Sequence, residues 1–135
     1  MAHEASFRVY YEDTDMAGVV YYANYLKYIE RARSDALRDA GVDQRAMRDA
    51  GLVFVVTRLE ADYLSPARYD DVIRIETETE AARGASAILA QRVFRGATPL
   101  FRSRVTFACM TIEGRPARLP AKTRAALAEM RGTTT

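Results

Sequence analysis

The chain has 135 residues, of which 49% are hydrophobic and 28% are charged. This length suits one domain with a sizeable core, and the composition is that of a globular protein rather than a disordered or fibrous one. The formal net charge is only +2, from 20 Lys and Arg against 18 Asp and Glu. Because binding to a phosphate backbone needs clustered basic residues, nucleic acid is not an expected partner.

The sequence also indicates in which cellular compartment the protein is expected. A single cysteine, Cys109, excludes an intrachain disulfide and suggests a reducing environment. Residues 1–6 lack the basic and then apolar pattern of a secretory signal, and no apolar run approaches the roughly 20 residues that span a bilayer. We therefore expect a cytoplasmic protein without membrane insertion, forming one domain over residues 1–135 with about 6–130 ordered.

The first third of the chain changes from a strand pattern to a helix pattern. A strand is predicted over Phe7–Glu12 from its β-favouring residues, and the turn DTDMAG follows at 13–18. Apolar residues then recur every three or four positions over Tyr25–Ala40, which predicts an amphipathic helix of about 16 to 18 residues. Gly41 suits the position just past its end, and a short second helix is predicted over Asp43–Ala50.

From residue 52 the apolar period becomes two. Four strands and a final helix are predicted: Leu52–Leu64, Val72–Glu80, Ala85–Arg95, Leu100–Ile112 and the helix Ala121–Met130. An uninterrupted alternation in the first of these places all odd-numbered side chains from 53 to 63 on one face. The expected fold class is α+β, with a long helix across a five-stranded antiparallel sheet. Since one helix cannot cover such a sheet, we expect a homodimer or a higher oligomer.

The residue types present in the sequence exclude several kinds of catalytic and metal site. The only histidine, His3, lies in a terminus expected to be mobile, so no imidazole is available for Ser-His-Asp or Cys-His catalysis. Cys109 lies in an apolar strand and is expected to be an inert core thiol, which also removes zinc sites of His and Cys. No glycine-rich nucleotide motif occurs, so no cofactor is expected.

The turn at 13–18 begins like a calcium loop, with acids at positions one and three and glycine at six. The fifth position is Ala17 and the twelfth is Asn24, where a bidentate Glu belongs, so a metal site is not predicted. What remains is a carboxylate beside a helix start. Open backbone N–H groups there polarise a carbonyl, and a nearby acid attacks it or deprotonates water.

One short segment supplies these parts: the Asp15 carboxylate, Gly18, and the backbone near Tyr22. Spacing alone leaves a simpler alternative open. Asp13 and Asp15 could merely cap the turn, Gly18 could be only a turn residue, and the neighbouring tyrosines could be packing groups.

The stretch YEDTDMAGVVYYANYLKYIERAR closely resembles the signature of hotdog-fold acyl-CoA thioesterases of the hydroxybenzoyl-CoA thioesterase type. The similarity continues through LVFVVTRLEADYLSPARYDD and GRPARLP, covers nearly the whole chain, and is greatest to the tol-pal-associated acyl-CoA thioesterases. The resemblance implies a long helix wrapped by an antiparallel sheet. It also implies homodimers with active sites at the subunit interface, often assembled into homotetramers.

The resemblance further implies hydrolysis of an acyl-CoA or acyl-carrier-protein thioester without a cofactor. Asp15 matches the catalytic carboxylate, as nucleophile or general base, and the backbone amide of Tyr22 matches the donor to the thioester oxygen. Gly18 would allow close backbone approach. Arg83, Arg118 and Lys122 are candidates for contacts with CoA phosphates, although each could be an ordinary surface cation.

This chain departs from its relatives at Tyr22, where many tol-pal-associated members have histidine and the hydroxybenzoyl type has tyrosine. A backbone donor survives the change, so hydrolysis is still expected, but a role for an imidazole is lost. The missing histidine also disfavours the hotdog dehydratases. The alternative function is a non-catalytic protein that binds acyl carriers, or a scaffold, linked to the cell-envelope system.

Overall fold

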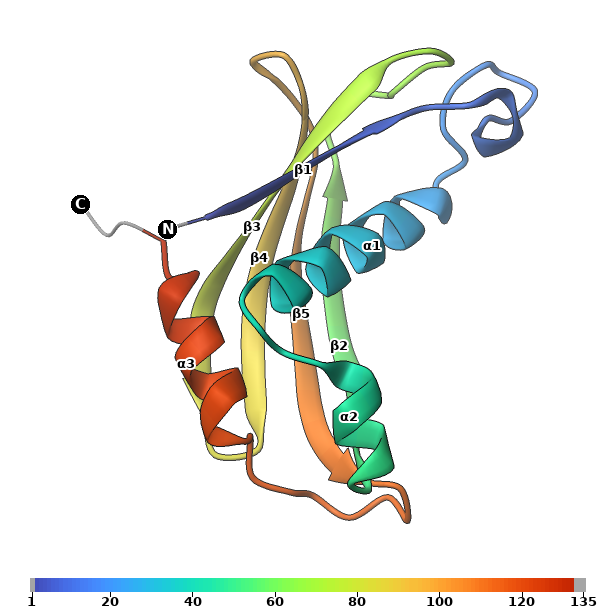
Figure 1. Cartoon of the computed structure of the whole chain (residues 1–135). Helices are drawn as coiled ribbons and strands as arrows, with labels where there is room; N and C mark the ends of the chain where they lie inside the picture. Colours follow the sequence, from blue (N-terminus) through green and yellow to red (C-terminus); the bar gives the residue numbers. More distant parts are fainter. Residues whose placement is uncertain (1, 133–135) are drawn as a thin grey trace.

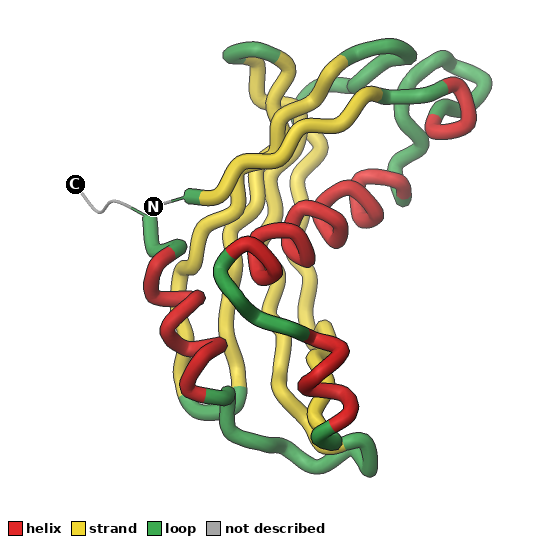
Figure 2. Tube along the Cα trace, viewed as in Figure 1, coloured by secondary structure: helices red, strands yellow, loops and turns green. Residues whose placement is uncertain are grey.

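The computed structural model describes residues 2–132. In it, one long helix lies across a five-stranded antiparallel sheet (Figure 1). The helices are α1 (Asn24–Asp39), α2 (Gln44–Asp49) and α3 (Ala121–Glu129), with a 3-10 turn, η1, at Tyr11–Asp13. The strands are β1 (His3–Arg8), β2 (Leu52–Tyr63), β3 (Val72–Arg83), β4 (Ser86–Arg95) and β5 (Thr98–Thr111). Their order across the sheet is β1-β3-β4-β5-β2, so β1 and β2 are the edges (labelled in Figure 1; all strands are yellow in Figure 2). The predicted α+β class is confirmed.

One stripe of α1 faces the sheet, as its periodicity predicts. The buried residues of α1 are Tyr25, Tyr28, Ile29, Ala32, Ala36 and Leu37. The first four belong to an apolar cluster with β3, β4 and β5, whereas Ala36 and Leu37 belong to a second cluster that includes Leu127 of α3. The N-terminal part of α1 therefore packs on one part of the sheet, and α3 covers the part of the sheet beyond the C-terminal end of α1.

A polar group lies under the middle of α1. The Gln91 side chain is fully buried, and its Nε2 donates to the Ile29 carbonyl at 2.8 Å and to the Thr77 hydroxyl at 3.0 Å. Its Oε1 accepts from an Arg33 guanidinium nitrogen at 3.0 Å, and the Ser103 hydroxyl donates to the Gln91 carbonyl at 3.1 Å. Every polar atom of the Gln91 side chain is thus hydrogen bonded, as burial requires.

The first strand differs from the prediction of Phe7–Glu12. It begins at His3 and ends at Arg8, because residues 3–8 form a continuous antiparallel ladder with β3. Residues Tyr11–Asp13 form the 3-10 turn η1 instead of continuing the strand, because the Asp13 carboxylate accepts the Tyr10 N–H and caps the turn. His3 is consequently not part of a mobile terminus: its Nε2 lies 2.7 Å from the Asp39 carboxylate.

The uninterrupted alternation predicted for β2 is wrong in its first half. The register with β5 shifts between Val56 and Arg58, which is a bulge at the edge of the sheet. Before it, the ring of Phe54 lies 5.1 Å from that of Phe107. After it, the ring of Tyr63 lies 5.0 Å from that of Phe101. Even-numbered residues therefore face α1 before the bulge and odd-numbered residues after it.

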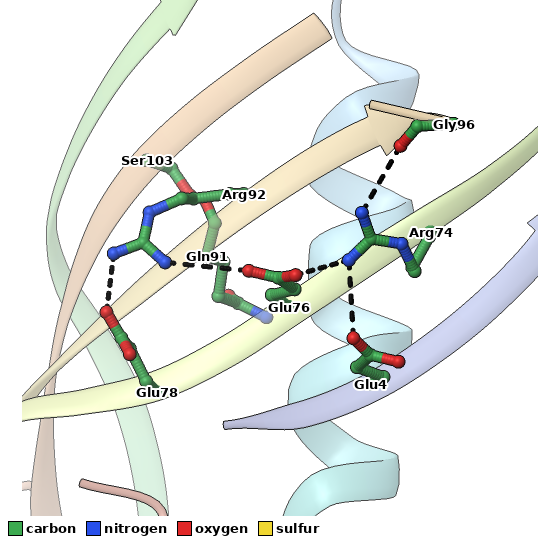
Figure 3. Close-up of polar contacts among 8 residues, drawn as sticks. All are labelled: Glu4, Arg74, Glu76, Glu78, Gln91, Arg92, Gly96 and Ser103. Atoms are coloured by element: carbon green, nitrogen blue, oxygen red, sulfur yellow. Dashed lines mark hydrogen bonds and ion pairs between the residues drawn. The ribbon is translucent and has the colours of Figure 1, made fainter. Parts of the chain in front are cut away.

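The opposite face of the sheet is charged (Figure 3). Arg74 pairs with Glu4 and Glu76, and Arg92 pairs with Glu76 and Glu78, whereas Gln91 lies on the side of α1. This confirms the alternation predicted for β3. Within residues 2–132, no helix combines the length and the apolar character needed to cross a membrane.

Candidate active site

The turn that carries Asp15 is fixed by its own backbone. The Asp15 N–H donates to the Val19 carbonyl at 2.9 Å, and the Gly18 N–H donates to the Asp15 carbonyl at 3.0 Å. Gly18 has φ of +77°, in the left-handed region that glycine tolerates best. A Cβ at this position would meet no other atom within 4 Å, so the conformation rather than crowding within the chain favours glycine.

The Asp15 side chain is exposed and only partly engaged. Its Oδ1 accepts the Ala17 N–H at 2.9 Å, which is the turn-capping role that spacing had left open. Its Oδ2 accepts no hydrogen bond from any group within residues 2–132. One oxygen thus orients the carboxylate, and the other is available to an incoming molecule or water.

Asp13, two residues earlier, is used differently. Its Oδ2 accepts both the Tyr10 N–H at 2.8 Å and the Tyr28 hydroxyl at 2.7 Å. Its carbonyl accepts the Tyr21 N–H at 3.0 Å and the Asn24 Nδ2 at 2.9 Å. Asp13 therefore serves as a junction between the turn and α1, whereas Asp15 keeps a free oxygen.

The start of α1 presents open donors. Ala23 occupies the N-cap position and supplies no side-chain cap. The Asn24 N–H donates to the Tyr21 carbonyl at 2.8 Å, but the N–H groups of Tyr22 and Ala23 have no acceptor in the part of the chain that the structure describes. Such groups carry the partial positive charge of the helix N-terminus. The Tyr22 carbonyl accepts the Tyr63 hydroxyl at 2.9 Å, which holds this backbone in place.

An apolar hollow of about 310 Å³ opens beside these groups. It is lined by Val19, Val20, Tyr22, Tyr25, Tyr63, Leu64, Ser65 and Pro66. Burial raises the pKa of Tyr25 and of Tyr63, so both hydroxyls stay protonated at neutral pH. The pKa of Tyr21 is also raised, first by the Tyr22 hydroxyl and to a smaller degree by burial and the Asp15 charge. Neutral tyrosines therefore border the hollow beside the Tyr22 backbone.

Sequence reasoning missed Tyr63 and Asn24. Tyr63 is 41 residues from Tyr22 and reaches it only because β2 ends beside the start of α1. Its signal is the aromatic side chain at the end of a predicted strand, which packing alone would also explain. In the sequence Asn24 stands only where a calcium loop would need Glu, whereas in the structure its amide donates to the Asp13 carbonyl.

The three predicted CoA-phosphate cations lie elsewhere. Arg83 ends β3, and Arg118 is next to Leu119, whose N–H donates to the Gly84 carbonyl at 3.0 Å; Lys122 is in the first turn of α3. Val72, at the Asp15 end of β3, is eleven residues from Arg83, a span of about 36 Å at roughly 3.3 Å per residue. All three are exposed, and the β3–β4 connection and the start of α3, where they lie, are at the opposite end of the sheet from the turn before α1 (Figure 1).

Residues 9–127 match the model of the thioesterase-like superfamily. The chain belongs to this superfamily. A relative from Haemophilus influenzae, named acyl-CoA thioesterase YbgC, is 40% identical over 121 residues, which cover 88% of this chain and 89% of the relative. The Escherichia coli acyl-CoA thioester hydrolase YbgC is 39% identical, over 84% of this chain and 86% of its own length.

Among solved structures of thioesterases, a probable thioesterase from Bartonella henselae superposes with a TM-score of 0.85 and 37% identity. The alignment covers 89% of this chain and all of that one. The resemblance to hotdog-fold thioesterases of the YbgC type is thus confirmed, as is the hotdog fold.

Proposed function

We propose that this thioesterase-like protein hydrolyses acyl-CoA to a free carboxylic acid and CoA. One observation carries the proposal: Asp15 keeps a free carboxylate oxygen, and the N–H groups of Tyr22 and Ala23, which follow the residue paired with the Asp13 carbonyl, are open. The names of the relatives from Haemophilus influenzae and Escherichia coli support the same activity.

In the proposed mechanism the thioester carbonyl oxygen accepts the Tyr22 N–H at the start of α1. Negative charge that develops on this oxygen in the transition state is stabilised by the donor and by the helix N-terminus. One well-placed donor of this kind lowers a barrier by about 3 kcal/mol. The hydrogen bond from Tyr63 to the Tyr22 carbonyl would hold the donor in place before the substrate arrives.

Asp15 has two possible routes. As a nucleophile its carboxylate attacks the carbonyl carbon, expels the CoA thiolate and forms a mixed anhydride, which water then hydrolyses. As a general base it takes a proton from the water that attacks the same carbon, and the thiolate leaves when the tetrahedral intermediate collapses. Both routes yield the free acid and CoA, and the unengaged Oδ2 serves either one.

A homodimer through the edge strand β2 would complete the site. On this strand Val56 is 49% exposed, Leu59 40% and Tyr63 50%, an apolar row of a kind that edge strands in monomers avoid. A two-fold axis perpendicular to the sheet would pair two β2 strands antiparallel. The Leu52 end of one copy would then lie beside the Tyr63 end, and hence the Asp15 site, of the other.

The same arrangement gives Arg83, Arg118 and Lys122 a route to the CoA phosphates. Because these cations lie at the end of the sheet away from Asp15, only a second copy running the opposite way brings them near the site. A tetramer would pair two such dimers. Acyl carrier protein, whose phosphopantetheine also carries a phosphate, is an alternative donor of the acyl group.

Thiol release from a panel of short, long and aromatic acyl-CoAs tests the proposal. We expect turnover of at least one of them, well above the rate of spontaneous hydrolysis. Binding without turnover, for every acyl-CoA and acyl-carrier-protein thioester tried, would instead support the non-catalytic acyl-carrier-binding function.

A further inference from the structure

Asp13 accepts four hydrogen bonds, and three of them join the turn to α1 or to the residues that enter it. Two reach its carboxylate, from the Tyr10 N–H at 2.8 Å and the Tyr28 hydroxyl at 2.7 Å. Two reach its carbonyl, from the Tyr21 N–H at 3.0 Å and the Asn24 Nδ2 at 2.9 Å. The donors at positions 21, 24 and 28 all belong to α1 or to the residues that enter it.

This junction lies between the two parts of the proposed mechanism. Asp15 is two residues beyond Asp13, and the Tyr22 N–H immediately follows Tyr21. Asp15 itself makes no side-chain hydrogen bond to α1 within residues 2–132, since its carboxylate accepts only from Ala17. The position of the acid relative to the helix donors therefore depends on the bonds to Asp13 and on the backbone pairing of the turn.

Given the proposed thioesterase function, on which this inference rests, we propose that Asp13 is a positioning residue for hydrolysis and that the Tyr28 hydroxyl acts through it. The tyrosine is well suited to a fixed donor. Burial, and then the hydrogen bond and charge of Asp13, raise the pKa of Tyr28 far above its usual value, so the hydroxyl remains protonated. Its ring is packed against Phe7, with centroids 5.9 Å apart, which limits its movement.

The geometry also says which property of Asp13 matters. Both donors to its side chain converge on one oxygen, Oδ2. An asparagine amide oxygen can accept both bonds in the same place, because a carbonyl oxygen has two lone pairs. The negative charge of Asp13 is therefore dispensable for positioning, in contrast to the charge of Asp15 in the proposed reaction.

The test compares kcat and KM for four variants and wild type. Tyr28→Phe and Asp13→Ala should each lose about tenfold or more in kcat with KM within about twofold, because misplacement of reacting groups by about 1 Å can cost as much as 100-fold. Asp13→Asn should stay within about fivefold of wild type. Ser103→Ala, the control, removes a buried hydroxyl bond to the Gln91 carbonyl away from the turn and should leave kcat unchanged.

The energetic coupling between Asp13 and Tyr28 distinguishes a positioning role from a general effect on stability. If Tyr28 acts through Asp13, Tyr28→Phe in an Asp13→Ala background should cause little further loss of kcat. Multiplicative losses, or a Tyr28→Phe kcat within about twofold of wild type, would overturn the proposal. So would an Asp13→Asn variant as impaired as Asp13→Ala, since the charge would then be required.

A second measurement does not depend on turnover. Hydrogen exchange of the Asp15 amide, which donates to Val19, should accelerate in Tyr28→Phe and Asp13→Ala but not in Asp13→Asn or Ser103→Ala. If wild type hydrolyses no thioester, the proposed function fails while this exchange pattern still decides whether Asp13 holds the turn. Unchanged exchange in all four variants would overturn the positioning role in either case.

Discussion

The polar groups around Gln91 and those around Asp15 lie beneath the middle and beside the start of the same helix, but they differ in how fully they are hydrogen bonded. Gln91 is completely buried and uses all its side-chain groups within the chain. Asp15 is exposed, and one of its oxygens and the N–H groups of Tyr22 and Ala23 have no partner within residues 2–132. Satisfied polar groups specify the packing of a core, whereas unsatisfied ones at a surface hollow are available to a substrate.

The stability of the fold should depend on the buried hydrogen bonds of Gln91. Gln91→Leu removes the hydrogen-bond acceptor of the Arg33 guanidinium, whose pKa burial already lowers, and removes the side-chain donor to the Ile29 carbonyl and the Thr77 hydroxyl. We expect a loss of about 2–4 kcal/mol in the free energy of unfolding, measured by urea denaturation.

Arg92→Gln is the matched control, because the neighbouring residue lies on the charged outer face and pairs with Glu76 and Glu78 (Figure 3). Loss of such a partly exposed pair should cost no more than about 1 kcal/mol. Equal losses in the two variants would show that the buried hydrogen bonds around Gln91 have no special weight.

The exposed region should depend on a second copy of the chain. A charge placed on the apolar edge by Leu59→Lys should convert the proposed dimer to monomers in size-exclusion chromatography with light scattering, and should lower kcat/KM at least about tenfold. Arg58→Gln, which changes the adjacent residue on the outer face, should stay dimeric. A Leu59→Lys variant that remains dimeric and active would place the interface elsewhere.

The smallest effect is expected at the Tyr22 side chain. Tyr22→Phe keeps the backbone N–H, so kcat should remain within about threefold of wild type in the thiol-release assay. A loss of about 100-fold would instead assign the hydroxyl a direct part in the reaction. Tyr63→Phe should have the larger effect of the two, because it removes the hydrogen bond that holds the Tyr22 carbonyl.

Much of the fold could be predicted because it depends on local periodicity. The stripe of α1, the buried face of β3 and the position of β5 follow from spacings of three and four or of two. The bulge after Val56 and the start of β1 at His3 could not be predicted, since both are set by the register with a partner strand.

The candidate site shows the same division. Asp15 and the Tyr22 backbone are proposed from one short segment and its resemblance to a family. The junction at Asp13 and the contact from Tyr63 depend on how a turn, a helix and the end of β2 meet in space. No local pattern distinguishes Asp13 from Asp15; their hydrogen-bond partners do.

The most direct test of the account is the kcat for hydrolysis of the best acyl-CoA by Asp15→Asn, measured beside Asp13→Asn. Both changes replace one carboxylate of the same turn by an amide of nearly the same shape. The account predicts a loss of at least about 100-fold for Asp15→Asn, whose amide is neither nucleophile nor base, with Asp13→Asn within about fivefold of wild type. Hydrolysis by Asp15→Asn at the wild-type rate would contradict the assignment of Asp15 as the catalytic carboxylate.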